Sequence, residues 1–118
     1  MAGEPIQRIN PGKRLSDAVV HGSTVYLAGQ VASNPNADVK AQTRDILAQI
    51  DRLLGGLGSS KQRLLSATIY LADMGDYSAM NEVWDAWVPA SDLPARATVQ
   101  ARLAKPEYRI EIQAIAAK

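Results

Sequence analysis

The sequence contains no cysteine and no phenylalanine, and it has a single histidine, His21, among 118 residues. The lack of cysteine excludes a disulfide framework, a thiolate metal site and a cysteine nucleophile. One histidine cannot by itself build a multi-histidine metal centre. We therefore expect no thiolate or multi-histidine metal site, and any catalysis has to come from arginine, lysine, carboxylate, hydroxyl or backbone groups.

A strong charge of one sign and long apolar runs are also missing. The chain has 13 basic and 12 acidic residues, a formal net charge of +1, so no net field attracts nucleic acid or an acidic membrane. No apolar run approaches the ~18 residues of a membrane span, and the first residues lack the apolar core of a signal peptide. We expect a cytoplasmic protein with no nucleic-acid or membrane partner, folded as one domain, 1–118.

The first part of the chain has the pattern of short strands. Residues 6–9 form a candidate strand, and the β-rich runs 18–21 and 24–28 are separated by Gly22-Ser23, the spacing of a tight hairpin. The cluster of Ser, Asn and Pro between 31 and 38 predicts a loop.

From about Val39 the apolar residues recur every three or four positions, which is the spacing of a helix. A helix is predicted from Val39 to the glycines at 55–58, with one apolar stripe, and a strand over Leu64–Leu71 follows it. A second helix is predicted to begin at Asp73 or Asp76 and to end before Pro89. The stripes are Ile46, Leu47, Ile50, Leu53, Leu54 and Leu57 in the first helix, and Tyr77, Met80, Trp84, Trp87 and Val88 in the second.

The last two alternating segments, 97–103 and 108–116, predict a hairpin around the turn 104–107. In that hairpin Gln100 would face Glu111 and Arg102 would face Arg109. One polar face would then carry Arg96, Thr98, Gln100, Arg102, Arg109, Glu111 and Gln113. This face is either the solvated side of a half-buried sheet or a site for a small carboxylate, because arginine presents two parallel donors to a carboxylate.

Two helices of this kind cover one face of a mixed sheet, which predicts an α+β two-layer domain. The other sheet face is then either solvated or buried against another subunit. Asn81 lies on the apolar stripe of the second helix as either a satisfied core amide or a functional group, and Gly29 is either a turn residue or a close backbone approach to a ligand.

Four segments carry a resemblance that spans nearly the whole chain. The segments 25–31 (VYLAGQV), 41–47 (AQTRDIL), 94–99 (PARATV) and 110–116 (IEIQAIA), with Asn81, resemble the Rid family, also called YjgF/YER057c/UK114. The resemblance implies a chorismate-mutase-like α+β fold that assembles as a homotrimer, with its sheets facing inward and a ligand cleft at each subunit interface.

The resemblance also implies an activity. Family deaminases hydrolyse reactive enamines and imines, such as 2-aminoacrylate, to 2-keto acids and ammonia without a cofactor. The small 2-imino or 2-keto acid would then be the partner of this chain. The alternative is a trimeric module that binds or senses small 2-keto or amino carboxylates without turning them over.

The resemblance also implies a role for each residue of this chain that matches a functional position of the family motif. Arg96 matches the arginine that clamps the substrate carboxylate, and Glu111 matches the glutamate that positions and activates water. Gly29, Thr98 and Asn81 match positions that line the cleft. Leu15 stands where many family deaminases have a tyrosine that lines the cleft, so the resemblance implies a divergent subgroup with an altered substrate range.

Overall fold

The chain begins with an antiparallel meander of short strands. The computed structural model describes residues 3–118 and contains β1 (Ile6–Ile9), β2 (Ala18–His21), β3 (Thr24–Leu27) and β4 (Gln30–Val31). β2 pairs with both β1 and β3, and Gly22 adopts a φ of 61° in the β2–β3 turn, a conformation that favours glycine. The predicted first strand and the first hairpin are confirmed.

Helix α1 (Val39–Gly56) begins at Asp38, whose Oδ1 accepts a hydrogen bond from Ala41 N at 2.8 Å. The predicted stripe is largely confirmed, because Ile46, Leu47, Ile50 and Leu54 are buried. The helix ends among the predicted glycines, and Gly58, with a φ of 74°, has the left-handed conformation that terminates helices.

The remaining elements are η1 (Lys61–Arg63), β5 (Leu64–Leu71), η2 (Met74–Asp76), α2 (Tyr77–Trp87), β6 (Ala95–Gln100) and β7 (Ile110–Ala117). The strands form one sheet in the order β1-β2-β3-β7-β5-β6, and β4 pairs with β7 beyond the end of β3. β5 and β6 are parallel and are joined through α2, whereas β7 is antiparallel to β5. The sheet is therefore mixed, as predicted.

The predicted C-terminal hairpin is wrong. β5 lies between β6 and β7, so Gln100 does not face Glu111, and Arg102 lies in the connection between the two strands and does not face Arg109. Alternation identifies a strand and its faces but not its partner. Here the crossover through α2 returns β6 to one edge of β5, and β7 pairs with the other edge of β5.

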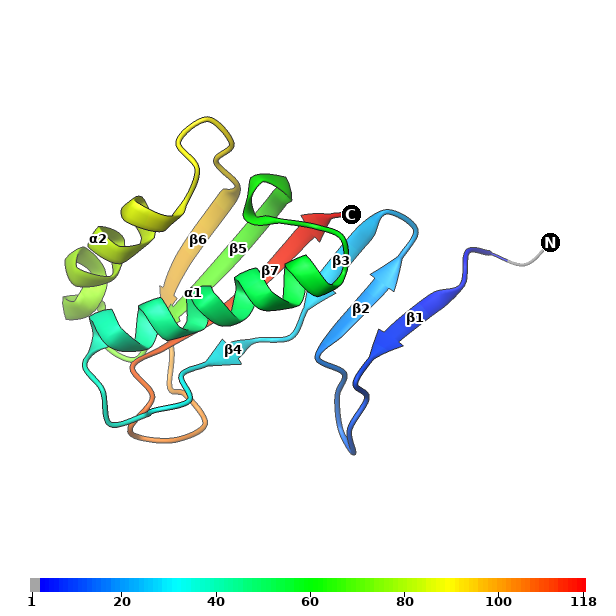
Figure 1. The fold of residues 1–118 in the computed structure, drawn as a ribbon. Helices are drawn as coiled ribbons and strands as arrows, with labels where there is room; N and C mark the ends of the chain where they lie inside the picture. Colours follow the sequence, from blue (N-terminus) through cyan, green and yellow to red (C-terminus); the bar gives the residue numbers. More distant parts are fainter. Residues whose placement is uncertain (1–2) are drawn as a thin grey trace.

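Both helices lie on the same side of the sheet, which confirms the α+β two-layer architecture (Figure 1). Ile69, Ile110 and Ile112 of the central strands are fully buried beneath the helices. The opposite face of the sheet, here called the open face, has no helix over it (Figure 1) and carries exposed apolar side chains, among them Tyr26 and Val99.

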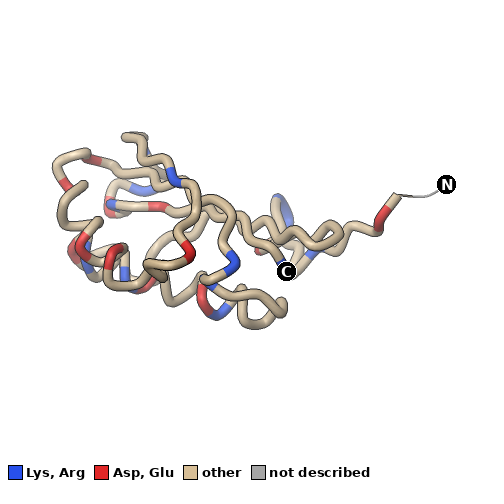
Figure 2. Tube along the Cα trace, turned by 90° about the horizontal axis from the view of Figure 1, so that it is seen from above, with Lys and Arg blue, Asp and Glu red and all other residues tan. Residues whose placement is uncertain are grey.

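The molecule is flat, with extents of 50 × 37 × 21 Å, and its N-terminal strands project beyond the helical layer (Figures 1 and 2). Basic and acidic positions are interspersed along the trace (Figure 2). None of the helices in residues 3–118 is long and apolar enough to span a membrane.

A buried amide connects the start of α1 to the loop before β7. The Gln42 side chain is fully buried, and its Nε2 lies 2.9–3.1 Å from the carbonyl oxygens of Pro35, Ala37 and Glu107. Its Oε1 accepts from the backbone N–H of Arg109 at 2.9 Å. One side chain thus satisfies backbone groups of two loops, which a buried polar group must do to avoid a desolvation penalty.

Replacing Gln42 by leucine is expected to lower the free energy of unfolding by about 3 kcal/mol, because buried backbone groups lose their partners. Urea denaturation measures the change, and Gln62→Leu is the matched control because Gln62 is exposed. An unchanged denaturation midpoint in Gln42→Leu would show that water or local rearrangement replaces these bonds.

Candidate carboxylate-binding site

Arg96 lies near the start of β6 and reaches toward α2. Its Nη1 donates to Asn81 Oδ1 at 2.8 Å, and its Nη2 donates to the Tyr77 hydroxyl at 3.3 Å. Its guanidinium carbon lies 5.3 Å from the centre of the Trp84 ring and 5.9 Å from that of Tyr77. These contacts hold the guanidinium in place by hydrogen bonds and cation–π attraction.

All of these contacts to Arg96 are made by uncharged groups. Within residues 3–118 the ion pairs join Lys40 to Glu82 and Arg109 to Asp76, and none involves Arg96. Arg109 presents a contrast, because its Nε and Nη2 donate to the Asp76 carboxylate at 2.9–3.1 Å. Within the described residues, no carboxylate therefore compensates the charge of Arg96, and its unused N–H groups suit an incoming carboxylate.

Thr98 lies two residues after Arg96 on the same face of β6. Its register partner is Ile69, a buried residue beneath the helices, so the Thr98 side chain also points to the helical side. Among the described residues, Thr98 Oγ1 is the buried side-chain polar atom that has no hydrogen-bond partner. An unsatisfied buried hydroxyl is uncommon in proteins, and a ligand that hydrogen-bonds it would remove the penalty.

Tyr77, Asn81, Trp84, Arg96 and Thr98 are here called the arginine cluster. The sequence predicts Arg96, Asn81 and Thr98 as site residues, and the structure adds Tyr77 and Trp84. The signal for them was present, because Tyr77, Asn81 and Trp84 are spaced by four and three residues and so share one face of α2.

Glu111 lies on the open face of the sheet, against Gly29. A Cβ atom added to Gly29 would lie 2.2 Å from Glu111 Oε2, so only glycine leaves room for the carboxylate in this position. Along β7, residues 111–112 pair with β4 and residues 115–117 pair with β3, and Gly29 lies in the chain between β3 and β4. Gly29 and Glu111 are here called the glutamate cluster.

The two clusters do not meet within one chain. Arg96 is in register with Ala67, a buried residue on the helical side, whereas Glu111 is in register with Tyr70, whose side chain is on the open face. Arg96 and Glu111 are separated by two strand spacings across the sheet and by three residues along it. These spacings place their Cα atoms roughly 14 Å apart. The prediction that Arg96, Thr98 and Gln100 share a face with Glu111 and Gln113 is therefore wrong.

The loop that carries Leu15 ends next to the glutamate cluster. Leu15 lies in the loop between β1 and β2 and is 64% exposed. Two residues later, the carbonyl of Asp17 accepts from Ala28 N at 2.9 Å, next to Gly29. β1 and β6 form opposite edges of the sheet, so Leu15 does not approach Arg96 of its own chain.

Comparisons with known proteins identify the family. The model of the family described as Endoribonuclease L-PSP matches residues 5–118. The chain is 50% identical over 112 residues to the RutC family protein YoaB of Escherichia coli K12. The aligned residues cover 95% of this chain and 97% of YoaB. The chain belongs to the YjgF/YER057c/UK114 family.

Solved structures of the YjgF/YER057c/UK114 family have the same fold. A member of the YjgF protein family from Neisseria meningitidis superposes with a TM-score of 0.93 at 49% identity, covering 99% of this chain and 98% of that one. A family member from Mycobacterium tuberculosis superposes with a TM-score of 0.85 at 27% identity, covering 97% of this chain and 100% of that one.

A metal centre is not formed by the described part of this YjgF-family chain. Residues 3–118 bring no three His, Asp or Glu side chains together in a group that could hold a metal ion.

Proposed function

We propose that this chain is a hydrolytic deaminase of small reactive enamines and imines of the 2-aminoacrylate type, producing 2-keto acids and ammonia. The observation that carries the proposal is the Arg96 guanidinium, held by Asn81 and Tyr77 and left without a carboxylate partner among the described residues. A guanidinium with free parallel donors fits a small carboxylate.

The substrate carboxylate would bind to the free N–H groups of Arg96, and this contact would orient the adjacent imine carbon. Because Trp84 and Tyr77 lie against the guanidinium, its position is set before the substrate arrives. The Thr98 hydroxyl, which has no hydrogen-bond partner among residues 3–118, would donate to the substrate from the same face. Asn81 acts here as a positioning residue, because its amide oxygen accepts from Arg96.

Glu111 would act on the water molecule that attacks. Water adds to the electrophilic imine carbon, the Glu111 carboxylate accepts its proton, and protonation of nitrogen allows the carbon–nitrogen bond to break. The products are a 2-keto acid and ammonia. The reaction needs no cofactor, because the imine carbon is already electrophilic.

We further propose that each site is shared by two subunits of a homotrimer. Arg96 and Glu111 lie on opposite faces of one sheet, so a single chain cannot present both to one small molecule. The edge strand β6 and the open face, which carries exposed Tyr26 and Val99, are the two surfaces that an assembly with inward-facing sheets would bring together. The arginine cluster of one subunit would then meet the glutamate cluster, and Leu15, of its neighbour.

Mixed trimers test both proposals. Arg96→Ala and Glu111→Gln chains, each inactive alone, are unfolded together and refolded in equal amounts. If each site takes Arg96 from one subunit and Glu111 from the next, random assortment makes about one quarter of the sites intact. We expect about a quarter of wild-type activity, measured as the added rate of keto-acid release when a pyridoxal-phosphate serine or threonine dehydratase supplies the imine.

The control is each variant refolded alone, which should remain inactive. A mixture without activity, from variants that assemble normally, would contradict the shared site. Wild-type protein that never accelerates imine hydrolysis, yet binds 2-keto acids through Arg96 in calorimetry, would replace the deaminase with a trimeric binding module for small carboxylates.

The interspersed charges support a small substrate over RNA. The net charge is +1, and basic and acidic positions are interspersed along the trace (Figure 2), so the chain has no large net positive charge to attract a phosphate backbone. RNA cleavage that survives stringent purification and disappears in one point variant would overturn this part of the proposal.

A further inference from the structure

A groove of about 430 Å³ lies between α1 and α2, and it opens to solvent, because Arg44, Asp51 and Ala86 of its lining are exposed. Its floor is apolar and is formed by Leu47 and Ala48 of α1 and by Val83, Ala86 and Trp87 of α2. The two alanines leave space where larger side chains would bring the helix surfaces into contact. The volume is within the range of small-molecule sites.

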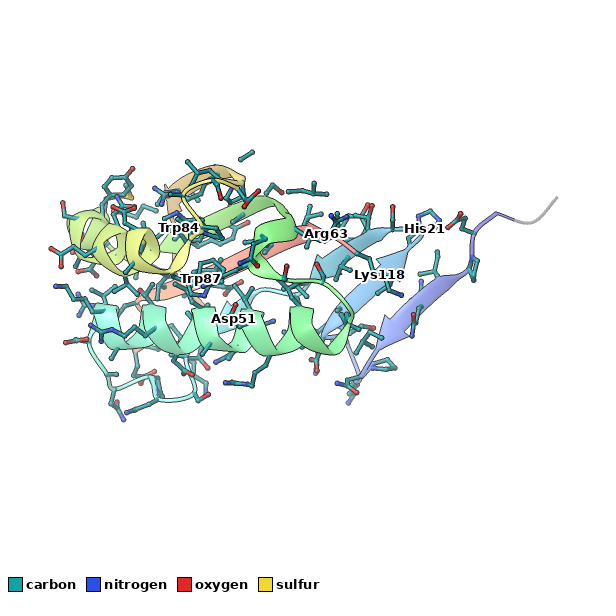
Figure 3. The ribbon with its side chains drawn as sticks, turned by 45° about the horizontal axis from the view of Figure 1, so that its top comes forward. His21, Asp51, Arg63, Trp84, Trp87 and Lys118 are labelled. Atoms are coloured by element: carbon teal, nitrogen blue, oxygen red, sulfur yellow. The ribbon has the colours of Figure 1, made fainter. Side chains whose placement is uncertain are left out.

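Both acidic side chains that line the groove are already engaged. Glu82 pairs with Lys40, whose hydrogen bond and positive charge lower the pKa of Glu82 below its usual value, so this carboxylate stays ionised and paired. The Asp51 carboxylate accepts from Trp87 Nε1 at 2.9 Å, and the two side chains meet between the helices (Figure 3). The bond from the uncharged indole N–H orients the Asp51 carboxylate but does not neutralise it. The lining of the groove therefore has three basic and two acidic side chains, a formal net charge of +1.

Two basic side chains that line the groove have no carboxylate partner within residues 3–118. Arg44 of α1 is exposed and belongs to neither ion pair. Lys61 of η1 lies with its Nζ 5.4 Å from the centre of the Trp87 ring. The groove thus combines an apolar floor, an aromatic ring and two unpaired cations, which is the complement of a flat apolar molecule that carries one negative charge.

We propose that the groove between α1 and α2 binds a small aromatic carboxylate, a ligand separate from the substrate of the Arg96 site. The ring of the ligand would lie on Ala48 and Ala86 beside Trp87, and its carboxylate would bind Arg44 and Lys61. In a trimer with inward-facing sheets the groove stays on the outer surface. The inference does not depend on the proposed deaminase activity, because no residue of the groove belongs to either cluster.

The two tryptophans of the chain make the groove observable. The rings of Trp84 and Trp87 lie 5.6 Å apart, and Trp87 alone lines the groove, so nuclear magnetic resonance of the indole N–H groups distinguishes the groove from the Arg96 site. The titration uses the full-length Arg96→Ala protein, which removes the other carboxylate site. The probes are phenylacetate and its uncharged counterpart phenylacetamide.

We expect phenylacetate to shift the Trp87 indole resonance saturably and to bind at least tenfold more tightly than phenylacetamide. Arg44→Ala and Lys61→Ala should each weaken phenylacetate binding by about tenfold. Ala86→Leu, a substitution at an exposed position, should weaken it as well by filling the groove. The control Arg52→Ala removes an exposed cation of α1 that does not line the groove and should leave the affinity unchanged.

The proposal is overturned if acid and amide bind equally, or if the affinity for phenylacetate is the same after removal of Arg44 and Lys61. It is also overturned if millimolar phenylacetate leaves the Trp87 resonance in place. Because these readouts are made without Arg96 and without turnover, failure of the groove proposal leaves the deaminase proposal standing, and failure of the deaminase proposal leaves the groove standing.

Discussion

Replacing Arg96 by alanine is expected to lower kcat/KM for imine hydrolysis by about a thousandfold. Two charge-assisted hydrogen bonds to the substrate carboxylate would be lost, each worth about 1.5–3 kcal/mol. The expected loss is in activity and not in folding, because Arg96 is half-buried and its partners Asn81 and Tyr77 can bind water instead. The measurement is keto-acid release in the coupled dehydratase assay, with thermal unfolding recorded in parallel.

Two further variants make this result specific to a guanidinium at this position. Arg96→Lys keeps the charge but not the planar pair of donors, and we expect it to recover only a small part of the activity. Arg102→Ala is the matched control, because Arg102 is an exposed arginine in the loop after β6 and should be dispensable. Full activity in Arg96→Ala would remove Arg96 from the mechanism.

Replacing Gly29 by alanine is expected to lower kcat by about a hundredfold, close to the loss that Glu111→Gln causes by itself. The added Cβ would lie 2.2 Å from Glu111 Oε2, so the carboxylate has to leave its position. The atom that is displaced is the end of a flexible side chain. The unfolding midpoint should therefore change little while turnover falls, and both are measured on the same preparation.

The double variant Gly29→Ala, Glu111→Gln should be no slower than either single variant, because both changes remove the same carboxylate. Gly12→Ala is the matched glycine control, since its added Cβ would have only an ordinary contact, 3.6 Å from Leu15 O. Additive losses in the double variant would separate Gly29 from Glu111 and assign the glycine another role.

Local patterns predicted most of the elements because their signals are local. The apolar stripe of α1, the capping Asp38 and the glycines that follow set the helix and both of its ends. The strand Leu64–Leu71 was predicted with the bounds observed. The η2 turn was missed: Asp73 caps this short 3₁₀ turn through Gly75 N at 2.8 Å, and α2 begins after Asp76, whose carboxylate binds Arg109 instead of capping the helix.

The sequence by itself determined the two helices, most of the strands, the buried faces of α1 and β7, and the residue types that are able to hold a carboxylate. It did not predict the short strand β4, and it placed β6 at 97–103 instead of Ala95–Gln100. It could not determine which strands are neighbours, because alternating side chains mark the two faces of a strand and carry no information about the strand beside it. Only the tertiary structure inserted β5 between β6 and β7. That placement turned Arg96 toward α2 and Glu111 toward the open face, and it makes a second subunit necessary for any site that uses both.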